Sequence, residues 1–166
     1  MKLGLEKFVK AVLYAYPLLE TVEKDYDEHI YNKAILSYKS ARPAEVLAEY
    51  ILGEIVEKKR LVWLKALVQR VLNGLSERER GFIGVKYFGQ RQQGGALEHK
   101  RKGESEVSES TYFRLQQRLG NKVGERFVAS GLNKEVFDRD FSQMTIFKEL
   151  LARIDRQEQR FAKANE

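Results

Sequence analysis

The sequence contains no cysteine and little proline: its 166 residues include two prolines and one tryptophan. Without cysteine, the chain can form no disulfide, no iron–sulfur cluster and no thiolate zinc site. With two prolines, little interrupts the long helices that the rest of the sequence favours. These absences exclude stabilisation by disulfides or by thiolate-bound metals, and they favour a helix-rich fold.

Long apolar runs are also missing. No stretch approaches the roughly 18 to 20 apolar residues that a membrane-spanning helix needs. The first residues, Met1–Glu6, reach an acidic side chain before any signal-peptide core begins. We therefore expect a cytoplasmic protein that has no membrane partner.

Few residues are suited to catalysis. The two histidines, His29 and His99, lie far apart, and neither has a second ligand three to five residues away, so we expect no metal site. No glycine loop of the G-x-x-x-x-G-K-S/T type is present to hold a phosphate. Asp25 and Asp27 would point to different sides of a helix, so they cannot share a proton-transfer site. We predict that the protein is not an enzyme and uses no cofactor.

The positive charge is concentrated in the middle of the chain. The net charge is +6, and residues 76–126 contain 11 Lys and Arg against 7 Asp and Glu. Residues 1–75 contain 12 against 10, and residues 127–166 contain 7 of each. Uneven basic charge favours a polyanionic partner, because each neutralised phosphate releases counterions. A solvated surface that keeps the protein soluble would carry the same charge.

The first half of the chain has the period of amphipathic helices. Apolar residues recur every three or four positions, and Pro17 ends or kinks the first helix. A second run reaches about Tyr38, and Ser40–Pro43 indicates a short connection. The pattern then continues from Pro43 to Asn73, which corresponds to about 45 Å of helix. A helix of that length needs a partner, so we predict a long antiparallel helical hairpin with coiled-coil character.

Two serines mark the starts of two further helices. Ser76 is followed three residues later by a glutamate, which is the capping-box pattern, and we expect the helix to cover residues 77–88. A second helix begins after Ser108. The segment between them, residues 90–106, is polar and contains paired glycines. A mobile loop, a short polar helix or a small hairpin would each fit that composition.

The helix after Ser108 carries the candidate binding residues. Four apolar residues at helical spacing should face the core: Tyr112, Leu115, Leu119 and Val123. Five outward side chains are candidates for reading base edges in the major groove of double-stranded DNA: Ser110, Thr111, Phe113, Arg114 and Gln117. Five cations are candidates for phosphate contacts, which hold position without reading sequence: Lys100, Arg101, Lys102, Arg118 and Lys122. An ordinary amphipathic helix with a solvated face would show the same pattern.

These motifs resemble a known family. The stretch Leu75–Arg80, continued through Tyr87-Phe88 and followed by Ser108–Arg114, resembles the helix-turn-helix of sigma-factor region 4. It is more closely similar to phage and prophage transcriptional regulators of the ArpU/RinA type, which also place a long helical half before segments of the form L-x-x-x-E-R and S-x-S-T-Y-x-R. The resemblance covers about Ala44–Phe127. It implies a sequence-specific DNA-binding regulator whose recognition helix begins near Glu109.

Other functions are compatible with the same features. In region 4 a compact apolar helix lies between the two motifs, whereas Arg91–Glu106 is longer and polar. The candidate face could instead bind RNA polymerase or another protein. A small terminase-like DNA-packaging subunit would also be helical and basic, and it should form a ring of eight or more copies. A helical interaction module that does not bind DNA is the third possibility.

Two helices are predicted at the C-terminal end. Gly131 should stop the recognition helix, Asn133 should cap a helix over Glu135–Phe141, and Ser142 should cap the last helix. The apolar side of the last helix either packs on the long helix or forms a homodimer suited to paired DNA half-sites. The expected architecture is all-α, in three parts: a hairpin over residues 1–74, a helix-turn-helix region over 75–130, and C-terminal helices for packing or dimerisation over 131–166.

Overall fold

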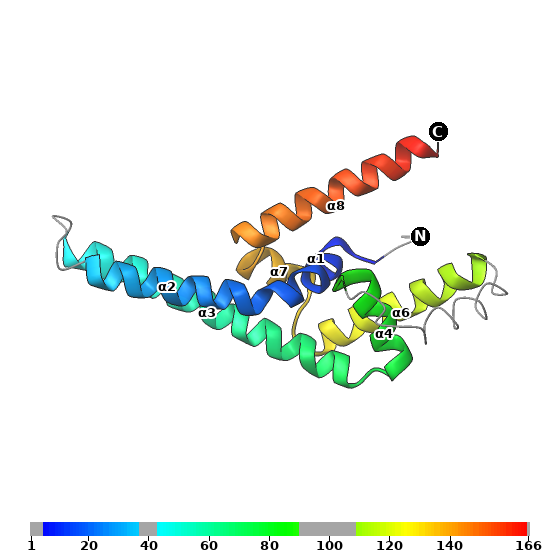
Figure 1. The fold of residues 1–166 in the computed structure, drawn as a ribbon, viewed down its shortest axis with the longest axis horizontal. Coiled ribbons are helices and arrows are strands. Elements are labelled where there is room, and N and C mark those ends of the chain that lie inside the picture. Colours follow the sequence, from blue (N-terminus) through cyan, green and yellow to red (C-terminus); the bar gives the residue numbers. More distant parts are fainter. Residues whose placement is uncertain (1–4, 37–42, 90–108, 166) are drawn as a thin grey trace.

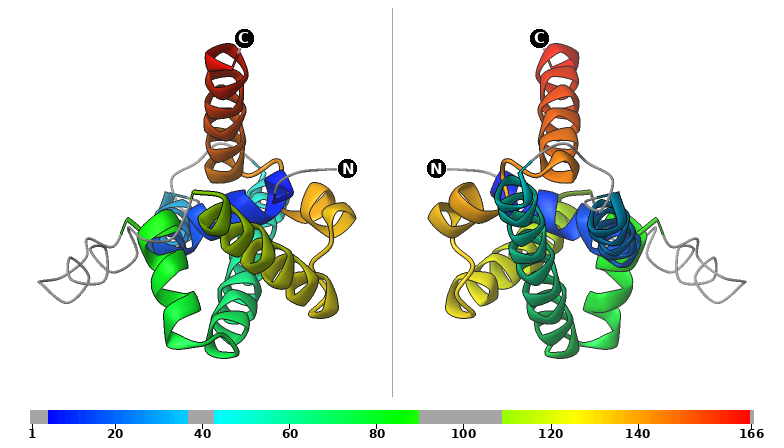
Figure 2. Two further views of the ribbon diagram at one scale, coloured as in Figure 1. Left: turned by 90° about the vertical axis from the view of Figure 1, so that its right-hand side faces the viewer. Right: turned by 90° about the vertical axis from the view of Figure 1, so that its left-hand side faces the viewer.

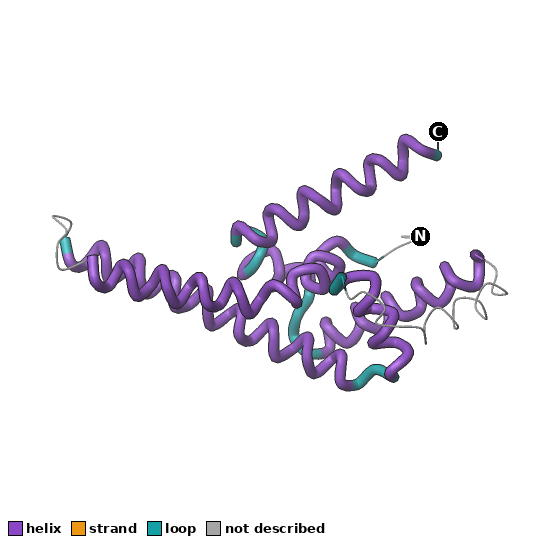
Figure 3. Tube along the Cα trace, in the orientation of Figure 1, coloured by secondary structure: helices purple, strands orange, loops and turns teal. Residues whose placement is uncertain are grey.

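The computed structural model describes residues 5–36, 43–89 and 109–165, and every regular element within these ranges is a helix (Figure 3). The elements are α1 (Lys7–Ala15), the 3-10 turn η1 (Tyr16–Leu18), α2 (Leu19–Leu36), α3 (Ala44–Asn73), α4 (Glu77–Tyr87), α6 (Glu109–Ala129), α7 (Lys134–Asp140) and α8 (Thr145–Ala164). The predicted all-α class is confirmed. The predicted helix-turn-helix stays a prediction, because residues 90–108 lie outside the described ranges.

The long helix and its partner lie side by side. In Figure 1, α1, η1 and α2 follow one another as one bent rod, and α2 runs antiparallel to α3. Pro17 lies within η1, so the α-helical pattern changes at the predicted position. The 30 residues of α3 form one uninterrupted helix, and Pro43 is its N-cap rather than its first helical residue.

Polar pairs join α2 to the first part of α3, and apolar residues of both helices, such as Val22, Ile30 and Ile51, are half-buried. We define the distal hairpin as residues 20–36 together with residues 43–60, and none of these residues is buried. Tyr26 donates a hydrogen bond of 2.7 Å to Glu57. Glu54 lies 2.6 Å from the Lys33 ammonium and 2.9 Å from His29 Nδ1. These contacts help to align the two helices, and Val22 and Tyr26 join the hairpin to the hydrophobic core.

The other described residues form what we call the body, which contains the hydrophobic core. Its centre is made of four fully buried phenylalanines: Phe127, Phe137, Phe141 and Phe147. The rings of Phe137 and Phe147 meet edge to face, with centroids 5.3 Å apart. Buried residues of α1, α3, α4, α6, α7 and α8 belong to the same core. All three predicted segments of the chain therefore contribute to one core.

Two of the three predicted signals beyond residue 129 are confirmed. Gly131 has φ +102°, and Leu132 N–H donates to the Phe127 carbonyl at 2.9 Å, which closes the end of α6. Asn133 caps α7 by accepting a hydrogen bond of 2.8 Å from Val136 N–H. The prediction for Ser142 was wrong: its hydroxyl donates to the Asp138 carbonyl at 2.5 Å. The last helix begins instead at Thr145, where Met144 supplies no side-chain cap.

The last helix packs mainly against α1. Phe147, Leu150 and Ile154 are buried on its inner side, and Lys7 pairs with Asp155 at its middle. The structure thus places this apolar side within the chain, on α1 rather than on the long helix that we had expected to receive it. In the end-on views of Figure 2, the rest of α8 stands away from the other helices. Phe161 near its end is 73% exposed.

Candidate nucleic-acid interface

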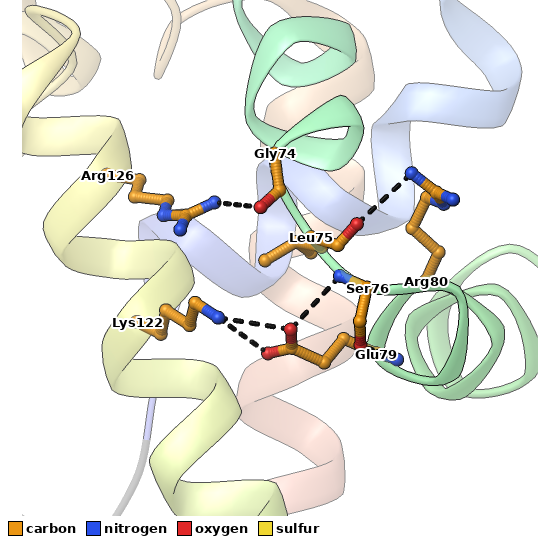
Figure 4. A network of polar contacts seen from close by, with 7 residues as sticks. All are labelled: Gly74, Leu75, Ser76, Glu79, Arg80, Lys122 and Arg126. Atoms are coloured by element: carbon orange, nitrogen blue, oxygen red, sulfur yellow. Dashed lines mark hydrogen bonds and ion pairs between the residues drawn. The ribbon is translucent and has the colours of Figure 1, made fainter.

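The predicted capping box forms at the start of α4. Ser76 Oγ accepts a hydrogen bond of 3.2 Å from Glu79 N–H, and the Glu79 carboxylate accepts one of 3.1 Å from Ser76 N–H. Each side chain therefore satisfies an amide that the first helical turn leaves unpaired. This corner between α3 and α4 is the support on which α6 rests (Figure 4).

Two cations of α6 attach it to this corner. Lys122 Nζ lies 3.0 Å from both carboxylate oxygens of Glu79, and Arg126 donates a hydrogen bond of 2.7 Å to the Gly74 carbonyl (Figure 4). The hydrogen bond from Ser76 N–H, and after it the one from Lys122, holds the pKa of Glu79 below its usual range. Glu79 therefore stays ionised and serves the helix cap and α6 at once.

The opposite side of α6 lies against the start of α1. A Cβ atom added at Gly120 would come within 1.9 Å of Leu5 Cδ1, and one at Gly124 would come within 3.8 Å of Val9. A larger residue at position 120 would require the tip of the Leu5 side chain to move. Val123 and Phe127, on the same helix, are buried. The second half of α6, from about residue 119, is therefore held by α1 on one side and by the corner on the other.

The first half of α6 projects from the body. In Figure 1 the helix extends beyond α4 toward its N-terminal end. The side chains that we predicted to point outward are exposed: Ser110, Thr111, Phe113, Arg114, Gln117 and Arg118. Arg114 and Arg118 are one turn apart and so lie on the same face of the helix. We call this face, with Ser110, Thr111 and Gln117 at its borders, the outer face of α6.

Two residues predicted to face the core do not reach it. Tyr112 is 51% exposed and Leu115 is 47% exposed, whereas Leu119 is partly buried and Val123 is buried. The periodicity identified the correct side of the helix, but the body does not extend beneath the first turns. Tyr112 instead packs against Phe82 of α4, with ring centroids 5.6 Å apart. This contact is a further support for the projecting half.

Phe113 belongs to a different side of the helix from Arg114. With Gln117 it borders an open groove of about 1160 Å³ that α1 and α8 line on the other side. Successive residues point about 100° apart around a helix, so Phe113 cannot share the outer face with Arg114 and Arg118. Its 65% exposure is exposure toward this groove.

The phosphate candidates have different surroundings. Arg118 is exposed on the outer face, whereas Lys122 is engaged with Glu79. The predictions for Lys100, Arg101 and Lys102 fall outside the described residues. Sequence reasoning missed Arg126, whose target is a backbone carbonyl and therefore leaves no pattern in the sequence. The sequence analysis also assigned Glu79 to the helix cap alone and did not identify Lys122 of α6 as its partner.

Comparisons with protein-family models, with curated proteins and with solved structures find no match to this chain. Within residues 5–36, 43–89 and 109–165, no helix is both long enough and apolar enough to span a bilayer. In the same ranges, no three side chains of His, Asp or Glu are grouped so that they could hold a metal ion. The functional argument therefore rests on the geometry of α6 and its supports.

Proposed function

We propose that this protein binds double-stranded DNA through the outer face of α6 and regulates transcription, as its resemblance to phage and prophage regulators implies. The observation that supports this function is the exposure of Arg114, Gln117 and Arg118 on a projecting helix whose other half is fixed in the body. A helix with its side chains is about 10–12 Å wide, which matches the major groove of about 12 Å.

The residues of the outer face have different roles in this proposal. Arg114 can donate two hydrogen bonds to guanine, and Gln117 can bond adenine in the same manner. Ser110 and Thr111 lie in the first turn, where short hydroxyl side chains can meet base edges or phosphates. Arg118, one turn further into the body, contacts the phosphate backbone. Phe113 is left out of base reading, because it points about 100° away from Arg114 around the helix.

The contacts that support α6 reduce the conformational entropy that DNA binding would cost. A recognition helix that is already ordered loses little conformational freedom on binding. The contacts of Lys122 with Glu79 and of Arg126 with Gly74 hold the helix axis before DNA arrives. We therefore assign Lys122 a positioning role in place of the phosphate contact that we first expected.

The experiment is a titration of labelled duplex DNA from the region upstream of the protein's own gene, followed by fluorescence anisotropy at about 50 mM and about 200 mM salt. Arg114→Ala should weaken specific binding by about 1–3 kcal/mol. Arg118→Ala should weaken binding to any duplex and reduce the slope of log K against log salt by roughly one.

A matched control is available on α8. Arg156 and Arg160 are also exposed and one turn apart, so Arg156→Ala/Arg160→Ala removes the same charge from a different helix. This double variant should bind like the original chain, whereas Arg114→Ala/Arg118→Ala should not. Equal losses in both would show that only total charge matters and would contradict the role of the outer face.

Two further outcomes separate the alternative functions. No binding at about 50 mM salt would exclude both DNA-binding functions. A ring of eight or more subunits in light scattering would favour the packaging subunit.

A further inference from the structure

The side of α3 that faces away from α2 carries an exposed apolar stripe. Its members lie on one side of the helix, with the charged Lys59 in the gap between Val56 and Val62: Ala48, Leu52, Ile55, Val56, Val62 and Trp63. Leu52 is 60% exposed and Val56 is 45% exposed. Each lies two positions before a residue that contacts α2, Glu54 and Lys58 respectively, and so points roughly opposite to it. We call this set the outer stripe of α3.

None of the described residues covers the distal part of this stripe. Toward the body, the stripe leads into a mostly apolar hollow of about 410 Å³ between α3 and α7. Val56 and Trp63 border this hollow on α3, and Val136 and Phe141 border it on the other side. An apolar seam with this spacing on one helix is the pattern by which helices pair with other helices.

Charges in and beside the stripe have opposite signs at its two ends. Glu45 and Glu49 lie toward the N-terminal end of α3. About three turns later come Lys59, which lies within the stripe, and Arg60, which lies 3.7 Å from Asp140 of the same chain. An antiparallel second copy of the same helix would bring the acidic end of each copy beside the basic end of the other. A parallel copy would place like charges together, which disfavours that arrangement.

From this geometry we infer that two copies of the chain associate through the outer stripe of α3, in antiparallel orientation. A twofold axis at the level of residue 54 places Leu52 of each copy against Val56 of the other, and Glu49 of each near Lys59 of the other. The two distal hairpins then form a four-helix bundle, with a contact over residues 45–63 of each α3, about 27 Å long. The inference goes beyond DNA binding and does not depend on it.

The mass of the full-length chain in solution tests the dimer. Light scattering over a dilution series should give twice 19.3 kDa at high concentration and 19.3 kDa after dilution. Leu52→Glu/Val56→Glu should give only the lower mass, because it would bury four carboxylates at the centre of the contact. Both positions are exposed in the single chain, so the variant should keep its helical circular dichroism.

The matched control uses the exposed apolar residues of α2. Tyr31→Glu/Ile35→Glu adds the same charge at similarly exposed positions on the other helix of the distal hairpin, and it should still form the dimer. If this control dissociates the dimer and the Leu52/Val56 variant does not, the contact lies on α2 and the inference is wrong. A mass of 19.3 kDa at every concentration would equally overturn it.

A charge exchange tests the orientation. Glu49→Lys and Lys59→Glu should each weaken association by about tenfold, because each places like charges opposite one another twice per dimer. The double variant Glu49→Lys/Lys59→Glu should recover most of the original affinity. Failure of the double variant to recover, with both single variants folded, would rule out the antiparallel pairing.

Discussion

The distal hairpin and the body are stabilised by different interactions, although α3 runs through both. In the body, six residues of α3 from Leu61 to Leu72 are buried among aromatic rings. In the distal hairpin, none of the described residues is buried, and α2 is held to α3 by contacts such as Tyr26 with Glu57 and Lys33 with Glu54. The body draws its stability from complete apolar burial, whereas the distal hairpin combines half-buried apolar residues with polar pairs of small net value.

The difference indicates separate roles for the body and the distal hairpin. The body can fix α6 because its core is closely packed and resists displacement. The distal hairpin exposes apolar side chains that contribute nothing to the packing of its own two helices. Its low burial is therefore consistent with a surface that is completed by association. Three changes, taken from the largest expected effect to the smallest, test the contrast.

The largest effect is expected in the body. Phe127→Ala removes a fully buried ring from the centre of the core and should lower the free energy of unfolding by about 3–5 kcal/mol. Urea denaturation followed by circular dichroism measures this change. Phe161→Ala, at the exposed end of α8, is the matched control and should change stability by less than about 0.5 kcal/mol. Similar losses in the two variants would contradict the assignment of the core.

An intermediate effect is expected at the corner between α3 and α4. Glu79→Ala removes the hydrogen bond from Ser76 N–H to the carboxylate and the Lys122 pair, and it should cost about 1 kcal/mol. Glu79→Gln can keep the cap and should cost less. Because the pKa of Glu79 is lowered in the folded state, the charge-dependent part is complete above about pH 4.5 and disappears as the pH falls through the lowered value. Urea unfolding of the original chain and of both variants at pH 7 and pH 3 measures this. If the variants lose as much free energy of unfolding at pH 3 as at pH 7, the charge of Glu79 is not the source of the stabilisation.

The smallest effect is expected in the distal hairpin. Burial alone would raise the pKa of Glu54, but hydrogen bonds from Lys33 and His29 outweigh it and hold the pKa below its usual range. Glu54→Gln should therefore lower the overall free energy of unfolding by less than about 1 kcal/mol. Hydrogen exchange at dilutions that keep the chain monomeric should show faster exchange in residues 20–36 and 43–60, with the body unaffected. Acceleration throughout the body would mean that the two regions unfold as one unit.

Local signals predicted the fold well. The cap at Ser76, the glycine at position 131 and the cap at Asn133 depend on neighbouring residues only, so their chemistry is visible in the sequence. The unbroken apolar pattern predicted the 30 residues of α3. The outward position of Arg114 and Gln117 also followed from helical spacing.

Long-range partners could not be predicted in the same way. Periodicity assigned Tyr112 and Leu115 to the inner side of α6, but it carries no information on how far the body extends beneath that side. Ser142 has the chemistry of a cap, yet its hydroxyl bonds back to α7, a competition that only the tertiary structure decides. The engagement of Lys122 by Glu79, 43 residues away, had no signal in the spacing of either residue.

The continuous course of α3 also restricts how the length of such a chain can vary. One residue inserted between Arg60 and Leu61 would turn the whole distal part of α3 by about 100° and carry Glu54 and Glu57 away from their partners on α2. An insertion of seven residues, about two turns, would restore their facing only if α2 were lengthened by the same amount. We therefore expect natural length variants of the hairpin to differ by matched additions of about seven residues in both arms.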